Sequence, residues 1–149
     1  MRIYIINGPN INLIGIREKD IYGEKTYESL MMFLMELCFE HNIDAKFFQS
    51  NSEGELIDAI QAAYNDADGI IINPAAYTHT SIAILDALKA VALPAIEVHL
   101  SNIYEREDFR RTSYPALACI KSFYGEGFDS YKKAILYLKE YLQKNGTPG

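Results

Sequence analysis

The sequence lacks most features that mark membrane, secreted and nucleic-acid-binding proteins. It has two cysteines and no tryptophan in 149 residues, and no apolar run approaches the roughly 18 residues of a membrane span. Twenty acidic residues against fourteen basic ones give a net charge of −6, which disfavours nucleic acid or an anionic membrane as a partner. The N-terminal apolar run, Ile3–Ile6, is too short for a signal peptide. These absences predict a cytoplasmic protein whose cysteines are buried free thiols.

The composition is that of a globular domain. Hydrophobic residues make up 49% of the chain and charged residues 23%, close to the usual values of about 45–50% and 25%. A single hydrophobic core usually takes about 100–200 residues, so 149 residues suit one domain. We expect one domain over residues 1–149, with a short polar tail at about 144–149.

Short apolar runs alternate along the chain with longer segments of helical period. This alternation indicates an α/β fold, namely a flavodoxin-like, doubly wound sheet of five parallel strands with helices on both faces. In such sheets the ligand lies beyond the carboxyl ends of the strands. The predicted strands are Ile3–Ile6, Ala45–Gln49, Gly69–Ile72, Ala95–Val98 and Leu117–Phe123, and the predicted helices are Tyr27–His41, Glu53–Tyr64, His79–Ala92 and Tyr131–Leu142.

The predicted strands end in unusually polar residues. Asn7 and Asn10 follow the first strand, and Asn73 follows the third. A single asparagine at such a place is more often a turn or cap residue than a ligand contact. Because these ends share one edge of the sheet, the amides together with Glu97 and His99 of the fourth strand favour a binding site there.

The connection from Gly8 to Lys25 is much longer than the usual 2–6 or so residues. Loops of this length within compact domains are usually lids or binding loops. This one carries Arg17 and Tyr22, and a solvated surface excursion is the alternative interpretation. We expect a lid loop at about residues 8–25.

Glu97 and His99 are separated by one residue of a predicted strand, so their side chains point to the same side, about 7 Å apart along the chain. Two ionisable groups are costly to bury in a parallel strand unless they pair. A structural Glu–His pair and a working acid–base pair both fit this spacing. Their position at the ligand edge favours the acid–base pair, with Glu97 orienting His99.

Several groups near the same edge suit an anionic ligand. Thr78–Ser81 starts a predicted helix, whose hydroxyls can cap it and whose positive end favours an oxygen-rich group. Ser101 resembles a second helix start, where backbone N–H groups could hold a carboxylate. Arg106 and Arg110 are four residues apart, so they would share one helical face. Surface ion pairing is the alternative, but with Arg17 on the facing loop they favour a small anionic substrate.

No metal or cofactor motif is convincing. The possible metal ligands lack the close spacing of common metal sites; they are His79, Asp86, Glu97 and His99. Gly125–Gly127 is followed by Ser130 where a dinucleotide fingerprint needs its third glycine. The sequence therefore predicts neither metal nor cofactor.

Proton transfer is the chemistry that these side chains could perform. His99 is the natural acid near neutral pH, and Tyr22 could be the base only if a cation such as Arg17 lowered its pKa from about 10. Elimination or isomerisation of an anionic, hydroxylated substrate fits this set. A flavodoxin-like module that binds a small anion without turnover, and a metal-dependent hydrolase, remain as alternatives.

At these residues the sequence closely resembles the type II 3-dehydroquinases (3-dehydroquinate dehydratases). The resemblance spans nearly the whole chain, and several motifs occur in order. They are NGPNINLIGIR at 7–17, YG at 22–23, QSNSEG at 49–54, INPAAYTHTS at 72–81, EVHLSN at 97–102 and REDFR at 106–110.

The resemblance implies dehydration of 3-dehydroquinate to 3-dehydroshikimate and water through an enolate. This is a step of the shikimate pathway of aromatic amino acid biosynthesis. Members of the family need no metal or cofactor and are dodecamers built from four trimers.

The resemblance also implies the catalytic roles. Tyr22, as tyrosinate, removes the C2 proton, and Arg17 lowers the pKa of this tyrosine. His99, held by Glu97, protonates the departing C1 hydroxyl. Asn10 helps to place the water that supports the enolate.

The implied binding residues surround these groups. Asn73 and the backbone amides of Leu100 and Ser101 hold the C1 hydroxyl and the carboxylate. His79 and Arg110 hold ring hydroxyls, and Arg106 supports the closed lid.

Asp86 is implied to contact the substrate side of the site. It follows His79 by seven residues, so on a helix it lies about 10 Å further along the axis, away from the ligand edge. Asp86 and His79 of one chain cannot then share a small ligand. We expect Asp86 to reach the pocket of a neighbouring subunit, with a local surface pair with Lys89 as the alternative.

Overall fold

Five parallel strands form the sheet of the computed structural model, which describes residues 1–16 and 25–146. Their spatial order is β2-β1-β3-β4-β5, so the direction of winding reverses between β1 and β3. This confirms the predicted flavodoxin-like α/β fold. The strands are β1 (Arg2–Asn7), β2 (Asp44–Gln49), β3 (Gly69–Asn73), β4 (Ala95–His99) and β5 (Lys121–Tyr124).

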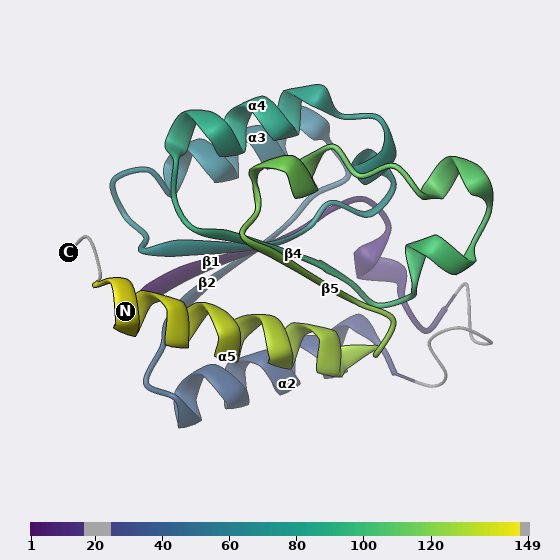
Figure 1. Ribbon diagram of the computed structural model, residues 1–149. Coiled ribbons are helices and arrows are strands. Elements are labelled where there is room, and N and C mark those ends of the chain that lie inside the picture. Colours follow the sequence, from purple (N-terminus) through teal and green to yellow (C-terminus); the bar gives the residue numbers. More distant parts are fainter. Residues whose placement is uncertain (17–24, 147–149) are drawn as a thin grey trace.

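Helices cover both faces of the sheet (Figure 1). One face packs against α2 (Tyr27–Glu40) and α5 (Phe128–Asn145), and the other against α3 (Glu53–Ala62) and α4 (Ile82–Val91). Successive side chains of a strand point to opposite faces. In β1, the odd residues therefore enter the core between the sheet and α2 and α5, and the even residues enter the core between the sheet and α3 and α4.

Two predicted elements differ from the structure. Ala75–His79 forms a short 3₁₀-helix, η2, and α4 begins only after Ser81, whose hydroxyl accepts from the N–H of Ile84 at 2.9 Å. His79 therefore ends η2 and does not start α4. Before β5, Pro115–Ala118 forms a 3₁₀-helix, η5, because proline suits a first helical turn and cannot donate to a strand ladder.

The cysteines are both free, with Cys38 buried and Cys119 only partly buried. Of the helices that the structure describes, none is long and apolar enough to cross a bilayer.

Candidate active site

A pocket of about 270 Å³ opens at the carboxyl ends of β1, β3 and β4. The loops after β1 and β3 meet closely here, since the N–H of Gly8 donates to the carbonyl of Asn73 at 2.8 Å. A Cβ on Gly8 would lie 2.6 Å from the carbonyl oxygen of Pro74, so only glycine allows this approach. The pocket lies where a parallel sheet of this order is expected to bind its ligand.

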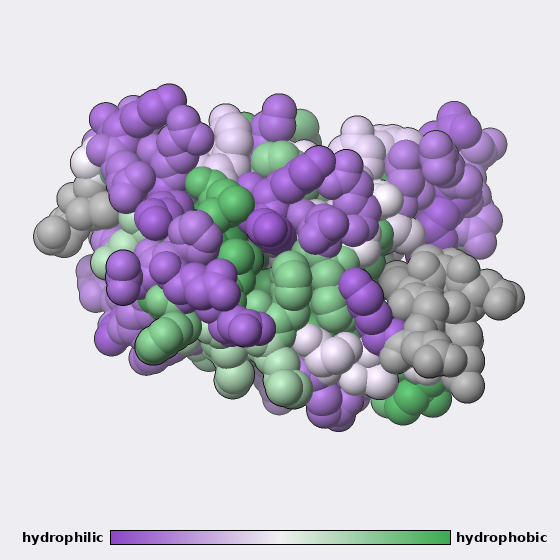
Figure 2. All heavy atoms as spheres, turned by 90° about the horizontal axis from the view of Figure 1, so that it is seen from below, coloured by the Kyte–Doolittle hydropathy of each residue, from purple (hydrophilic) through white to green (hydrophobic). Residues whose placement is uncertain are grey.

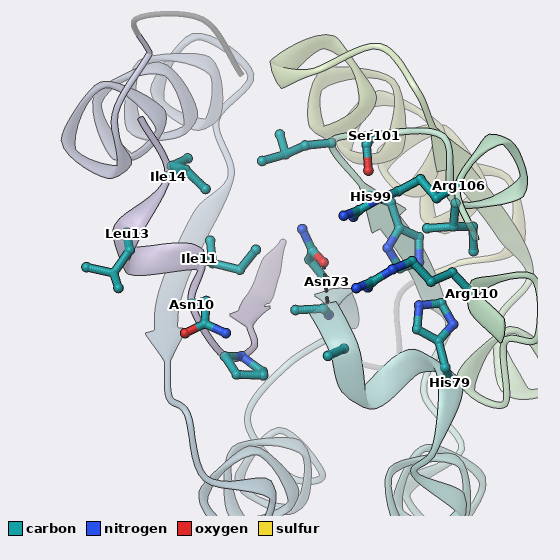
Figure 3. Close-up of a pocket in the computed structure, with 15 residues that line it drawn as sticks. Asn10, Ile11, Leu13, Ile14, Asn73, His79, His99, Ser101, Arg106 and Arg110 are labelled. Atoms are coloured by element: carbon teal, nitrogen blue, oxygen red, sulfur yellow. Dashed lines mark hydrogen bonds between the residues drawn. The ribbon is translucent and has the colours of Figure 1, made fainter. Parts of the chain in front are cut away.

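Two unlike walls face each other across the pocket (Figure 3). The wall after β1 includes η1 (Ile11–Leu13) and is largely apolar. The opposite wall follows β3 and β4 and includes η2, η3 (Ile103–Glu105) and η4 (Asp108–Arg110). The sequence-predicted residues that line the pocket are Asn10, Asn73, His79, His99, Leu100, Ser101, Arg106 and Arg110.

Asn10 is held in a left-handed backbone conformation, with φ of 69°, immediately before η1. Asparagine adopts this conformation more readily than most residues other than glycine. Its N–H donates to Oδ1 of Asn51 at 3.0 Å, which ties the loop after β1 to the loop after β2. This places the Asn10 side chain at the pocket.

Asn73 belongs to a buried hydrogen-bond chain beneath the pocket. It pairs in register with Asn7 of β1, and the hydroxyl of Tyr131 on α5 joins the two side chains. Tyr131 donates to Oδ1 of Asn7 at 2.6 Å and accepts from Nδ2 of Asn73 at 2.9 Å. Oδ1 of Asn73 accepts from the N–H of Ala75 at 3.1 Å, so the amide orientation is fixed and one N–H remains for the pocket.

Glu97 and His99 lie together at the end of β4, and both are buried. Nε2 of His99 is 3.5 Å from Oε2 of Glu97. Oε2 also accepts from the hydroxyl of Ser113, and Oε1 accepts from Ser122 of β5 at 3.0 Å. Burial opposes ionisation of Glu97, but His99 and the two hydroxyls outweigh it, so the pKa of Glu97 is lowered from its ordinary value.

His79, at the end of η2, lies on the same wall of the pocket as this pair (Figure 3). Its Nδ1 is 2.8 Å from the carbonyl oxygen of Thr112, and because a carbonyl only accepts, Nδ1 carries the hydrogen. Burial is the main cause that lowers the pKa of His79, although the Thr112 carbonyl opposes it. A neutral His79 then offers Nε2 as an acceptor for a ligand hydroxyl.

The two arginines reach the pocket from different backbone, Arg106 from the extended link between η3 and η4 and Arg110 from the end of η4. η3 ends at Glu105 and η4 begins at Asp108, with Arg106 extended between them, so the prediction that Arg106 and Arg110 share one helical face is wrong. Nε of Arg110 pairs with Oε2 of Glu107 at 2.6 Å. Arg110 therefore both forms the predicted local ion pair and lines the pocket.

The other predicted residues lie elsewhere. Asp86 is exposed on α4 and does not line the pocket of its own chain. Arg17 and Tyr22 lie outside the described residues. Among residues 1–16 and 25–146, no group of three or more His, Cys, Asp or Glu side chains is arranged to hold a metal ion.

Three polar residues that contact the site carry no signal in the sequence. Ser113, Ser122 and Tyr131 contact Glu97 or the asparagine pair, yet none lies at the end of a predicted strand that carries a motif. Tyr131 was placed in a predicted helix, where a buried aromatic is ordinarily a core residue. Only the register of the sheet reveals these contacts.

Comparisons with known proteins agree with the geometry. A family model described as dehydroquinase class II matches residues 1–139. The 3-dehydroquinate dehydratase of Clostridium acetobutylicum is 54% identical over 144 residues, which are 97% of this chain and 100% of that protein. The one of Caldicellulosiruptor saccharolyticus is 55% identical over 142 residues, covering 95% and 98%. The crystal structure of type II dehydroquinase from Butyrivibrio crossotus has a TM-score of 0.91 at 50% identity, covering 93% of this chain and 97% of that one.

Proposed function

This chain belongs to the class II dehydroquinase family and dehydrates 3-dehydroquinate, and we propose that the pocket beyond β1, β3 and β4 is its active site. The buried Glu97–His99 pair carries this proposal, since it places a proton donor in a pocket whose same wall presents Arg106 and Arg110. An acid beside two cations suits a substrate that is both anionic and hydroxylated.

Substrate binding is proposed to use the polar wall that follows β3 and β4. Asn73 and the backbone amides of Leu100 and Ser101 hold the C1 hydroxyl and the carboxylate. His79 and Arg110 hold ring hydroxyls, in keeping with a neutral His79 that accepts at Nε2. Arg106 is proposed to support the closed lid.

The chemistry is proposed as two proton transfers. Tyr22, as tyrosinate with its pKa lowered by Arg17, takes the proton from C2 and leaves an enolate, which Asn10 supports through a water. His99, held by Glu97, gives a proton to the C1 hydroxyl, which departs as water and leaves 3-dehydroshikimate. The position of His99 against the ionised Glu97 supports its part in this scheme.

Ultraviolet absorbance tests the function directly. The product is a conjugated enone carboxylate, so purified protein should produce an absorbance rise from 3-dehydroquinate, undiminished by EDTA. An absorbance rise that needs added metal would favour the metal-dependent hydrolase. Binding of the substrate without any rise would favour the binding module.

We also propose a homo-oligomer, a dodecamer of four trimers as the family resemblance implies. Exposed apolar side chains support association between copies. Figure 2 looks onto the α2 and α5 side and shows hydrophobic residues gathered near the middle of this face. Met32, Met35 and Phe39 of α2 are exposed by 71%, 55% and 84%.

Asp86 is proposed to act on the pocket of a neighbouring subunit. Subunit mixing tests this, because Asp86→Ala and Tyr22→Phe proteins, each nearly inactive alone, should regain part of the wild-type rate when reassembled together. Confirmed hybrid oligomers whose rate stays at the sum of the two parents would place Asp86 in its own chain or outside catalysis.

A cytoplasmic location is the remaining proposal. The two free cysteines support it, because thiols stay reduced in that compartment.

A further inference from the structure

The segment formed by residues 112–114, between η4 and η5, packs against the end of η2. Its first carbonyl, that of Thr112, accepts from Nδ1 of His79 at 2.8 Å. Its last N–H, that of Tyr114, donates to the carbonyl of Thr78 at 3.0 Å. The backbone of this segment is therefore fixed on both sides of its middle residue, Ser113.

The side chain of Ser113 points in the other direction, to the acid pair of β4. Its hydroxyl donates to Oε2 of Glu97, which is the oxygen that lies 3.5 Å from Nε2 of His99. Ser122 donates instead to Oε1, at 3.0 Å. Both serines hold the carboxylate, but only Ser113 contacts the oxygen that faces the imidazole.

We propose that Ser113 is a positioning residue for the proton transfer by His99. By donating to Oε2, it fixes the plane of the Glu97 carboxylate and so the orientation of the imidazole that this carboxylate holds. A hydrogen bond from a hydroxyl to a carboxylate is charge-assisted, which makes it strong enough to fix one geometry. This inference rests on the proposed function, in which His99 is the acid.

A purely structural role for Ser113 is also defined by the structure. Oγ of Ser113 accepts from the N–H of Ala116 at 3.3 Å, which caps the first turn of η5. If capping were its only role, a substitution would lower thermal stability and leave kcat and the pKa of Glu97 unchanged. Kinetics therefore separate the two roles.

The titration of Glu97 in the free protein gives a second readout of the Ser113 contact. The titratable groups that face this carboxylate are His99 on β4, His79 on η2, Tyr104 on η3 and Cys119 after η5. Removing the Ser113 hydroxyl takes away a donor that favours the ionised carboxylate. The pKa of the Glu97 carboxyl should then rise, and an NMR titration of this carboxyl in the free protein measures the rise.

The experiment compares Ser113→Ala with Ser113→Thr, which keeps the hydroxyl, and with Ser122→Ala, which removes the donor to the other oxygen. Ser113→Ala should lower kcat by roughly 10-fold to 100-fold with KM nearly unchanged, the size expected for losing one bond to a charged group. Ser113→Thr should keep most of the rate. Ser122→Ala should lower kcat less than Ser113→Ala.

The outcomes separate the inference from the proposed function. If the wild-type protein turns over 3-dehydroquinate, a Ser113→Ala variant with normal kcat, an unchanged Glu97 pKa and lower thermal stability would leave Ser113 as a cap only. A wild-type protein without turnover would overturn the proposed function, and this inference with it. If Ser113→Ala does not fold, Ser113→Cys replaces it, since a thiol of similar size is a weaker donor and should give a kcat below that of Ser113→Thr. Equal kcat in those two variants would contradict the proposal.

Discussion

The two ends of the parallel sheet differ in how far their polar side chains are buried and hydrogen-bonded. At the amino end, charged groups pair with one another and remain partly exposed. Arg2 contacts Asp44 at 2.8 Å and Asp66 at 2.5 Å, and Lys46 contacts Asp66 at 3.2 Å. The hydroxyl of Tyr4 also donates to Asp66, so each charge in this group has a partner.

At the carboxyl end, polar groups are buried and their hydrogen bonding is incomplete. Within the described part of the chain, two buried side-chain atoms, Asn7 Nδ2 and Thr78 Oγ1, lack a hydrogen-bond partner in the protein. A third, His99 Nε2, has the ion-pair contact with Glu97 at 3.5 Å but makes no hydrogen bond. All of them lie at or next to the pocket end of β1, β3 and β4. Such atoms cost stability, and their concentration at this end indicates that it was shaped for ligand chemistry while the amino end stabilises the fold.

The largest expected effect is loss of the acid at the carboxyl end. His99→Ala should lower kcat by about 10²–10⁴-fold, the usual contribution of a general acid, while ligand binding persists through Asn73 and Arg110. Arg2→Ala, at the amino end, should leave kcat unchanged. Steady-state kinetics measure kcat in both variants, and calorimetry measures how tightly each binds the product. A His99→Ala enzyme of near-normal kcat would contradict the assignment of the acid.

Tyr22→Phe tests the proposed base in the same way. We expect a loss of kcat of similar size, again about 10²–10⁴-fold, because the hydroxyl that accepts the C2 proton is removed. Arg17→Ala should resemble it if its main task is to keep Tyr22 ionised. A Tyr22→Phe enzyme that retains its kcat would overturn the assignment of the base.

The sequence predicted the strands and most helices because a parallel sheet requires buried apolar runs with amphipathic crossovers between them. It also predicted that Glu97 and His99 lie together. In a strand, residues i and i+2 have side chains on the same side. It failed where hydroxyl and proline chemistry decide local geometry. Ser81 caps α4 two residues after His79, and Pro115 starts a 3₁₀-helix ahead of β5.

The contacts that complete the site could not be predicted from the sequence. Ser113 reaches Glu97 across 16 residues of chain, and Tyr131 reaches Asn7 across 124. Neither spacing is periodic, so no pattern within one strand or helix indicates these contacts. They depend on the order of the strands and on where α5 crosses the sheet.

Tyr131→Phe should give the largest loss of stability among the variants that sharpen this comparison. It leaves Oδ1 of Asn7 and Nδ2 of Asn73 buried without the hydroxyl that joins them. Each such atom costs about 1–3 kcal/mol, so for the two atoms the free energy of unfolding should fall by about 2–6 kcal/mol. Substrate binding should weaken as well, because Asn73 lines the pocket. Urea denaturation at fixed protein concentration measures the loss of stability, and KM measures the weaker binding of substrate.

Tyr4→Phe is the same substitution at the amino end, and its effect should be smaller. Asp66 loses one donor but keeps Arg2 and Lys46, and its side chain is 34% exposed, so water can replace the hydroxyl. We expect a loss of about 1 kcal/mol in the free energy of unfolding, with kcat and KM unchanged. A loss as large as that of Tyr131→Phe, or a change in kcat, would break the contrast between the two ends.

The pH dependence of Asp66 should give the smallest effect. The Tyr4 hydroxyl, followed by Lys46 and then the charge of Arg2, lowers the pKa of Asp66 to about 2. An unfolded aspartate has a pKa of about 3.9, so the stabilisation is present in full above roughly pH 4 and is lost as the pH falls from there toward 2. The difference in urea midpoint between wild type and Asp66→Asn should therefore shrink across this range. Because the carboxylate is partly exposed, added salt should also reduce this difference in urea midpoint at neutral pH.

The matched control is Asp58→Asn, which changes an exposed carboxylate of α3. A difference between wild type and Asp66→Asn that stays constant from pH 7 to pH 2 would mean that the Asp66 carboxylate stabilises the amino end by its shape and not by its charge.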